Sequence, residues 1–140
     1  MYDLMKPKKI DTIPEGDKFI YEIKYDGGSA VIEKYQDTVK IYHNKNPDPQ
    51  EYKYPELVED CLHYLKDGVY ICEIVVFNQG ISDFSLFQKR QVENKMKIQL
   101  RRKLYPVTAM IYDVIKVNGK DVTDYALLDR KKILSERVFD

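Results

Sequence analysis

Residues 68–77, GVYICEIVVF, form the most apolar run of the chain. The run is short and rich in β-branched side chains, which is typical of a buried strand. Alternation along a strand places its single charged residue, Glu73, on the same face as Ile71 and Val75. A buried carboxylate is costly unless it meets a cation or several hydrogen-bond donors. We therefore expect a central strand whose Glu73 either serves a site or, if the strand lies at an edge, reaches solvent.

The spacing of apolar residues changes in the segments on either side of this strand. Residues 55–66 place apolar side chains on one helical face, and Pro55 occupies a position that a first helical turn tolerates. Four more elements are predicted further along the chain: a short helix capped by Ser82 or Asp83, a helix over 94–104, a buried strand over 106–117 ending at an Asn118-Gly119 turn, and an amphipathic helix over 127–139.

The N-terminal half favours β-structure. Residues 1–18 combine prolines and charges with little periodicity, and they predict an extended lead-in over the domain. The β-rich runs over 18–26, 28–35 and 38–43 predict a three-stranded antiparallel meander. A loop with two prolines follows over 44–54. The expected fold class is α+β, with largely antiparallel sheets and packed helices in one domain spanning 1–140.

Composition excludes several classes of protein. The chain has 23 basic and 23 acidic residues, so its net charge gives no support to indiscriminate nucleic-acid binding. It contains no membrane-length apolar run, no hydrophobic signal core and only two cysteines, and we expect a cytoplasmic setting with Cys61 and Cys72 as core thiols. His43 and His63 lack metal-ligand spacing, so a zinc site is not expected.

Residues 21–30, YEIKYDGGSA, place Lys24 beside Asp26 and two glycines. Lysine is mostly protonated at neutral pH, but burial beside positive charge or a metal lowers its pKa and frees the amine to attack an electrophile. Glycines also let a backbone or a phosphate approach closely. Two interpretations stay open: Asp-Gly-Gly is an ordinary hairpin turn, or the backbone is bent to hold Lys24 over a ligand.

The K-x-D-G motif, with Glu two residues before the lysine, resembles the nucleotidyl-transfer motif of ATP-dependent DNA ligases. That family belongs to a superfamily with RNA ligases and mRNA capping enzymes. Further segments are similar to the family in its order along the chain, above all to end-joining-type ligases of bacteria and archaea: 52–57, 72–77, 80–90 and 106–134. The resemblance implies the N-terminal part of a ligase-type nucleotidyltransferase (ATP-grasp-like) domain, with Lys24 at a nucleotide pocket between two sheets.

The resemblance also implies roles for the residues around the motif. Lys24 would attack the α-phosphate of ATP and form lysyl–AMP, from which AMP passes to a DNA 5′-phosphate. Glu22 and the backbone of Ile23 would read the adenine edge, and Asp26 and Gly27 would shape the turn.

Two residues of later strands complete this implied site. Glu73 would contact the ribose or help to hold a divalent metal, and Tyr112 would stack on the adenine. Without the resemblance, Tyr112 would be taken for a core aromatic. Mg²⁺ is implied because the phosphates need charge neutralisation. The implied partner is nicked or broken double-stranded DNA, in DNA repair.

The sequence departs from the family at several positions. Ser29 stands where the family has an arginine, and Asn44 aligns with the arginine of its second motif. Ile71 and Cys72 replace the aspartate and glycine of its acidic strand motif. The later Glu-Gly and Lys-x-Lys motifs and the oligonucleotide-binding-fold domain are not in the sequence. We therefore expect this chain alone to be weak or inactive in DNA sealing.

Three alternatives remain from the sequence. The chain could be a piece of a ligase whose site is completed by its missing half or by a second copy, a degenerate nucleotide- or nucleic-acid-binding module, or an RNA ligase or capping-type guanylyltransferase. Exposed sheet edges would favour association. A basic cluster either contacts DNA phosphates or is a solvated helix face: Lys95, Lys97, Arg101, Arg102 and Lys103.

Overall fold

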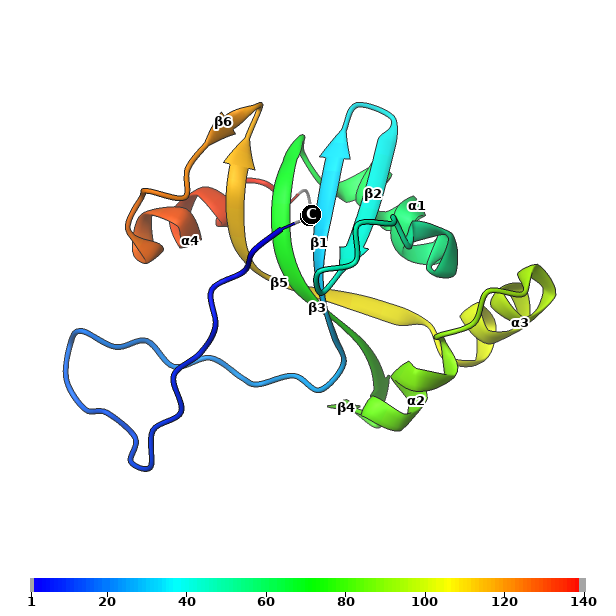
Figure 1. Cartoon of the computed structure of the whole chain (residues 1–140), viewed down its shortest axis with the longest axis horizontal. Coiled ribbons are helices and arrows are strands. Elements are labelled where there is room, and N and C mark those ends of the chain that lie inside the picture. The colour runs from blue at the N-terminus through cyan, green and yellow to red at the C-terminus, as the bar shows by residue number, and fades with distance from the viewer. Residues whose placement is uncertain (1, 139–140) are drawn as a thin grey trace.

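The computed structural model describes residues 2–138 and centres on a curved sheet in which all paired strands are antiparallel (Figure 1). The main strand order is β2-β1-β3-β5-β6, and β4 pairs with the end of β3. The strands are β1 (Gly28–Tyr35), β2 (Thr38–His43), β3 (Gly68–Asn78), β4 (Ile81–Ser82), β5 (Val107–Val117) and β6 (Lys120–Asp121). The helices are η1 (Glu51–Lys53), α1 (Pro55–Tyr64), α2 (Phe84–Lys89), α3 (Lys95–Leu104) and α4 (Leu127–Ser135). The expected α+β class is confirmed.

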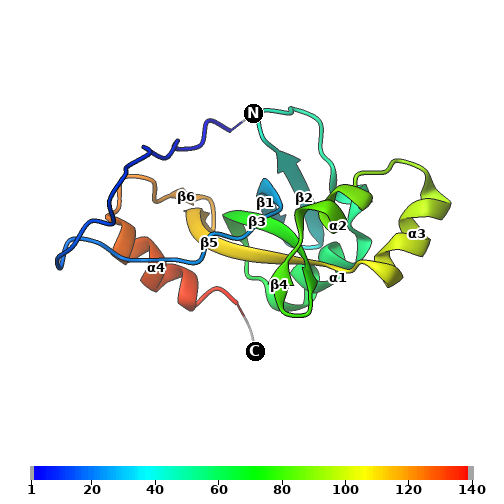
Figure 2. The same ribbon diagram turned by 90° about the horizontal axis from the view of Figure 1, so that it is seen from below.

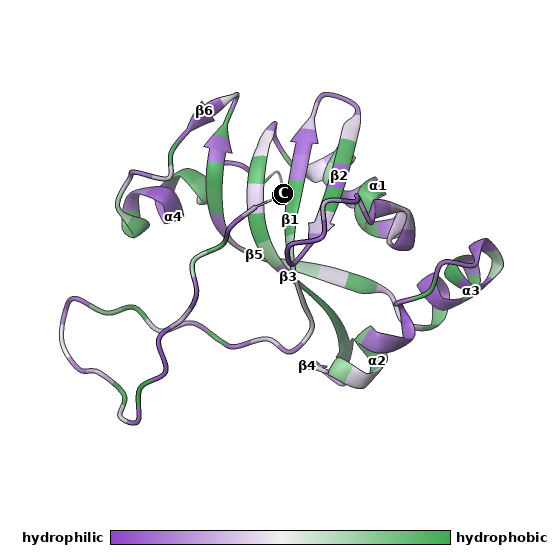
Figure 3. Ribbon diagram, viewed as in Figure 1, coloured by the Kyte–Doolittle hydropathy of each residue, from purple (hydrophilic) through white to green (hydrophobic). Residues whose placement is uncertain are grey.

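The predicted central strand is β3, which lies between β1 and β5. Alternate residues along it point into the main core, and Figure 3 shows hydrophobic residues along both β3 and β5. The core residues of β3 are Tyr70, Cys72, Ile74 and Val76. Helix α1 adds Leu57 and Cys61 to the same core, and α2 adds Phe87. Burial of a side chain such as Leu57 or Ile74 contributes about 1.5–3 kcal/mol to the stability of the fold. This face of the sheet therefore holds the domain together.

Local signals explain where the later elements begin and end. The Asp83 carboxylate accepts a backbone hydrogen bond at the start of α2, and Asn94 does the same for α3. Asn118 and Gly119 both have positive φ, as a tight turn between β5 and β6 requires. The predicted cap at Asp83 and the predicted turn are confirmed, whereas the cap at Asn94 was not predicted. The predicted C-terminal helix ends at Ser135, and residue 139 of that prediction lies outside the described residues.

The predicted strand over residues 18–26 is wrong, and so is the meander built on it. Residues 2–26 contain no helix or strand, and β1 pairs instead with β2 and β3. An alternating segment forms a strand only where a neighbour accepts and donates its backbone hydrogen bonds. Within residues 2–138 no strand pairs with this segment, most of which lies away from the sheet in Figure 1.

The two cysteines are free and buried, as expected of core thiols. Burial raises the pKa of the Cys61 thiol to about 12, and it also raises the pKa of Cys72. No helix formed by residues 2–138 is long and apolar enough to cross a membrane.

Candidate active site

The Asp-Gly-Gly sequence brings the chain close to β3 and α2 as it enters β1. A Cβ atom on Gly27 would lie 2.0 Å from the carbonyl oxygen of Ile74, and one on Gly28 would lie 2.4 Å from the ring of Phe87. Neither glycine has the positive φ of a type I′ turn, and β1 begins directly at Gly28. The hairpin interpretation is therefore wrong, and close packing explains the glycines.

Lys24 lies in the extended segment before β1, and not at the end of a strand as predicted. Its side chain is 90% exposed, and Nζ lies 3.2 Å from Oδ1 of Asp26. The Asp26 backbone N–H donates to the Ser82 hydroxyl of β4 at 2.9 Å. Strand β4 thus fixes the backbone two residues after the lysine, while the amine stays open to a ligand.

A cavity of about 1160 Å³ lies beside Lys24, large enough for a nucleotide-sized ligand. Five of the predicted site residues line it: Glu22, Ile23, Lys24, Glu73 and Tyr112. The two other predicted residues, Asp26 and Gly27, do not line the cavity and lie at the bend behind the lysine. One face of a single sheet forms the floor, so the expected pocket between two sheets is not found in residues 2–138.

Glu73 lies in the middle of the sheet and not on an edge strand. Its Cα pairs with Ser29 on β1 and with Met110 on β5. Burial raises the pKa of the Glu73 carboxyl, while a hydrogen bond from the Gly27 backbone and the charge of Lys24 act in the opposite direction. The solvent-facing edge interpretation is therefore wrong, because this carboxylate faces the cavity from a central strand.

Tyr112 is the extra residue of a β-bulge. The register passes from Cys72 opposite Ile111 to Ile71 opposite Asp113, so Tyr112 has no partner on β3. Bulges re-aim side chains and are frequent beside active sites. Here the bulge leaves the Tyr112 ring 39% exposed at the cavity, where an aromatic ligand could stack on it.

Helix α4 supplies two basic residues that the sequence did not reveal as part of the site. Arg130 donates to both carboxylate oxygens of Asp113, at 2.9 and 3.2 Å, and this buried pair fixes α4 to β5. The next residue, Lys131, donates to the Glu22 carboxylate and to the carbonyl of Tyr112. Glu22 therefore faces a lysine as well as the cavity in which it was expected to read adenine.

The N-terminal segment forms another wall of the cavity. Residues 4–8 line it opposite the sheet. The Tyr2 hydroxyl donates to Glu33, and its ring meets Tyr42 edge-on with centroids 6.0 Å apart. Figure 2 shows this segment on one side of the sheet and α1 and α4 on the other.

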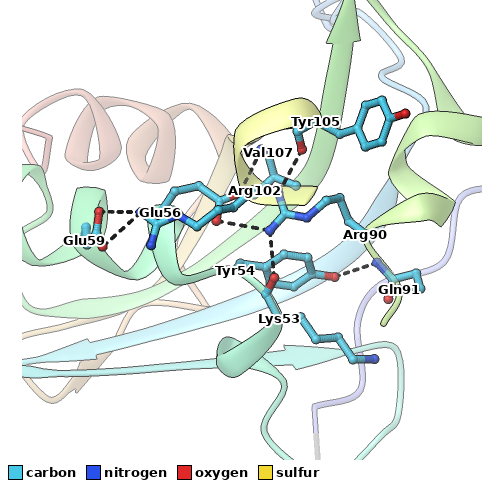
Figure 4. A network of polar contacts seen from close by, with 9 residues as sticks. All are labelled: Lys53, Tyr54, Glu56, Glu59, Arg90, Gln91, Arg102, Tyr105 and Val107. Carbon is cyan, nitrogen blue, oxygen red and sulfur yellow. Dashed lines mark hydrogen bonds and ion pairs between the residues drawn. The ribbon is translucent and has the colours of Figure 1, made fainter. Parts of the chain in front are cut away.

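Arg90 anchors the elements beneath the site (Figure 4). This wholly buried guanidinium binds both oxygens of Glu56 on α1 and the carbonyls of Lys53 and Tyr105. It thereby fixes the end of α2, whose Phe87 packs against Gly28. The sequence prediction missed Arg90, because a charged residue after a short helix normally points to solvent.

Two members of the predicted basic cluster are held by the protein itself. Arg102 donates to both oxygens of Glu59, and Arg101 donates to the carbonyl of Lys89 (Figure 4 for Arg102). DNA contact by the three lysines of the cluster stays a prediction.

Binding of Mg²⁺ at the cavity stays a prediction. Within residues 2–138 no three histidine, cysteine or acidic side chains form a metal cluster. Mg²⁺ is commonly held by one or two carboxylates together with substrate phosphates. Glu73, the predicted metal ligand, is one of the carboxylates that line the cavity.

Lys24 at the rim of the cavity shares it with a carboxylate and an aromatic ring of the antiparallel sheet, which are the residue types expected of a lysine-dependent nucleotidyltransferase. The chain belongs to the ATP dependent DNA ligase domain family, whose model matches residues 4–139. It is 34% identical to the DNA ligase of Caldivirga maquilingensis over 94% of this chain and 22% of the relative. It is 32% identical to the DNA ligase of Sulfophobococcus zilligii over 98% of this chain and 23% of the relative.

Solved structures show the same fold. The ligase domain of LigD from M. tuberculosis superposes with a TM-score of 0.63 at 22% identity, over 82% of this chain and 35% of that one. A mycobacterial DNA ligase D complexed with ATP and MES also gives 0.63 at 21% identity, over 84% and 36%. The chain thus spans about a fifth of the curated relatives and about a third of the ligase structures.

Proposed function

We propose that this chain is the nucleophile-bearing part of a DNA ligase adenylation domain, within a single partial domain. The observation that carries the proposal is the exposed Lys24 amine on a cavity that Glu73 and Tyr112 share. As the free amine, Lys24 Nζ attacks the α-phosphorus of ATP. A nitrogen–phosphorus bond forms, the bond to the bridging oxygen breaks, pyrophosphate leaves and the amine gives up a proton.

The other residues bind and orient the nucleotide. Tyr112 stacks on the adenine, and Glu22 with the Ile23 backbone lies within reach of its edge. Glu73 contacts the ribose or holds Mg²⁺, which when bound neutralises phosphate charge. Asp26 and Gly27 set the position of Lys24 without touching the ligand.

Ser29 favours weak activity in this chain alone. It lies opposite Glu73 on the cavity side of the sheet. A serine cannot make the bidentate phosphate contact that an arginine makes at this place. We therefore expect slow adenylation and no complete sealing by this chain unaided.

We further propose that another polypeptide segment covers residues 19–23. This stretch, FIYEI, is β-prone and extended, and it exposes apolar side chains such as Tyr21 at 64% and Ile23 at 74%. A strand laid beside it would bury these side chains and satisfy its backbone groups. The rest of a ligase or a second copy of this chain could provide that strand.

The proposed acceptor of AMP is the 5′-phosphate of nicked or broken double-stranded DNA, in DNA repair and in a cytoplasmic setting. In the second step a phosphate oxygen attacks the lysyl–AMP phosphorus, the nitrogen–phosphorus bond breaks and the lysine is regenerated. The DNA ligase relatives support this choice of acceptor.

Intact mass before and after incubation with ATP and Mg²⁺ tests the proposal. We expect the mass of one AMP to be added to the wild-type chain and none to Lys24→Ala. An equal adduct on both proteins would disprove the role of Lys24. ATP binding without any adduct would favour the second candidate, a non-catalytic binding module, which the serine at position 29 supports.

A further inference from the structure

We propose that Lys6 and Lys8 of the N-terminal segment bind the β- and γ-phosphates of the nucleotide at this cavity. The proposal rests on the proposed function, in which the cavity holds ATP. Both lysines line the same 1160 Å³ cavity as Lys24 and stand on the wall opposite the sheet. Both lysines lie in the N-terminal segment, for which the resemblance to the family implies no phosphate-binding group.

The charge balance of the cavity favours an anion at these lysines. Three carboxylates line the cavity, and two of them are neutralised: Glu22 by Lys131 and Asp113 by Arg130. Among the ion pairs of the described residues, none involves Lys6 or Lys8. The segment wall therefore carries uncompensated positive charge, and a polyphosphate supplies the matching charge.

The segment is built to hold these two lysines in place. Tyr2 attaches its beginning to β1 and β2 through Glu33 and Tyr42. Pro7 lies between the lysines and keeps the residue before it extended. The segment therefore passes over the cavity as a strap that carries a cation on each side of the proline.

Nucleotide selectivity tests the assignment. Dissociation constants of ATP and of AMP are measured for the wild type, for Lys6→Ala/Lys8→Ala and for Lys9→Ala/Lys18→Ala, which removes two charges outside the cavity lining. We expect the first variant to lose about tenfold or more in ATP affinity, as for one or two charge-assisted contacts. AMP affinity should be unchanged, and the loss should shrink at high salt.

The other outcomes either overturn the inference or separate it from the proposed chemistry. An equal loss for AMP and ATP, or an equal loss in the control variant, would show a general effect of charge. A loss of affinity for a nicked duplex with ATP binding unchanged would assign the lysines to DNA. If the variant binds ATP as the wild type does, the inference fails while AMP addition to Lys24 stands. If ATP binding depends on both lysines but no adduct ever forms, the inference stands and the proposed chemistry fails.

Discussion

His43 links the residues around the site through a chain of hydrogen bonds, and a neutral ring can make all of them. Its Nδ1 lies 2.9 Å from the Ser29 carbonyl, which can only accept, so Nδ1 carries the proton. Nε2 therefore accepts from the Tyr54 hydroxyl at 2.6 Å, and the Gln91 amide donates to the Tyr54 oxygen at 2.8 Å. If Nε2 were protonated, the Tyr54 oxygen would have to accept from it, and the Tyr54 hydroxyl proton would lose this acceptor.

The first prediction concerns pH and this histidine. Burial lowers the pKa of His43 and the charge of Lys53 lowers it further, against the opposing effect of the Ser29 carbonyl. The unfolded chain then binds a proton more readily than the folded one. The free energy of unfolding should therefore be full above about pH 6.5 and fall as the pH drops towards the lowered pKa.

Urea unfolding between pH 8 and pH 5 measures this effect. The side chains that contact the His43 ring directly or through Tyr54, namely Tyr54, Phe87 and Gln91, carry no charge in this range. His43→Gln should lose the His43 part of the pH dependence, and His63→Gln, the chain's other histidine, should keep it. The same pH profile in both variants would contradict this effect of His43 on stability.

At the scale of residues, the sequence predicted several side chains that line one cavity, but it did not predict the residues that surround them. Lys24, Glu73 and Tyr112 could be found because each breaks a local pattern or belongs to a quoted motif. Lys131 meets Glu22 across 109 residues, and a lysine on an amphipathic helix carries no sign of such a contact. Lys6 and Lys8 were missed because lysines in an extended segment likewise carry no sign of a distant contact.

At the scale of elements, the helices and the two long strands followed from periodicity and caps, which are local properties. The segment over 18–26 shows the limit of that method. Its alternation predicts a strand, but a strand also needs a neighbour, and periodicity says nothing about whether one is present. The bulge at Tyr112 likewise depends on pairing between β3 and β5.

Two arginines that bind α1 give the second prediction. Arg90 is wholly buried and holds Glu56, whereas Arg102 holds Glu59, which is 65% exposed. Arg90→Ala leaves Glu56 without its cation and should cost about 3–5 kcal/mol of unfolding free energy. Arg102→Ala should cost at most about 1 kcal/mol, because water screens the exposed pair.

Chemical denaturation of both variants at one pH makes the comparison. Both wild-type arginines make two bonds to a glutamate of the same helix, and they differ in burial and in the two backbone carbonyls that Arg90 also binds. Similar losses for the two variants would show that Arg90 does not anchor α2 to the core.

At the scale of the whole molecule, the packing is one-sided. Helices cover the core face of the sheet, while the cavity face is bordered by the extended segment of residues 2–26 and, at one side, by Lys131 and Leu134 of α4. That segment exposes apolar side chains on its way to Lys24. The cavity therefore lies beside the part of the chain that has no strand partner. A strand paired with that part would hold the backbone around Lys24 in place.

The last prediction is that residues 20–25 become protected from hydrogen exchange when such a strand is supplied. In the chain alone their backbone N–H groups join none of the backbone hydrogen bonds of the described residues, so their amides should exchange fast. A second copy at high concentration, or the remaining part of the Caldivirga maquilingensis ligase, should slow them about tenfold or more. Tyr21→Pro removes one N–H and should abolish this protection while exchange in β3 stays unchanged. Protection that survives the proline, or none with either partner, would contradict strand pairing and leave the exposed segment without an occupant.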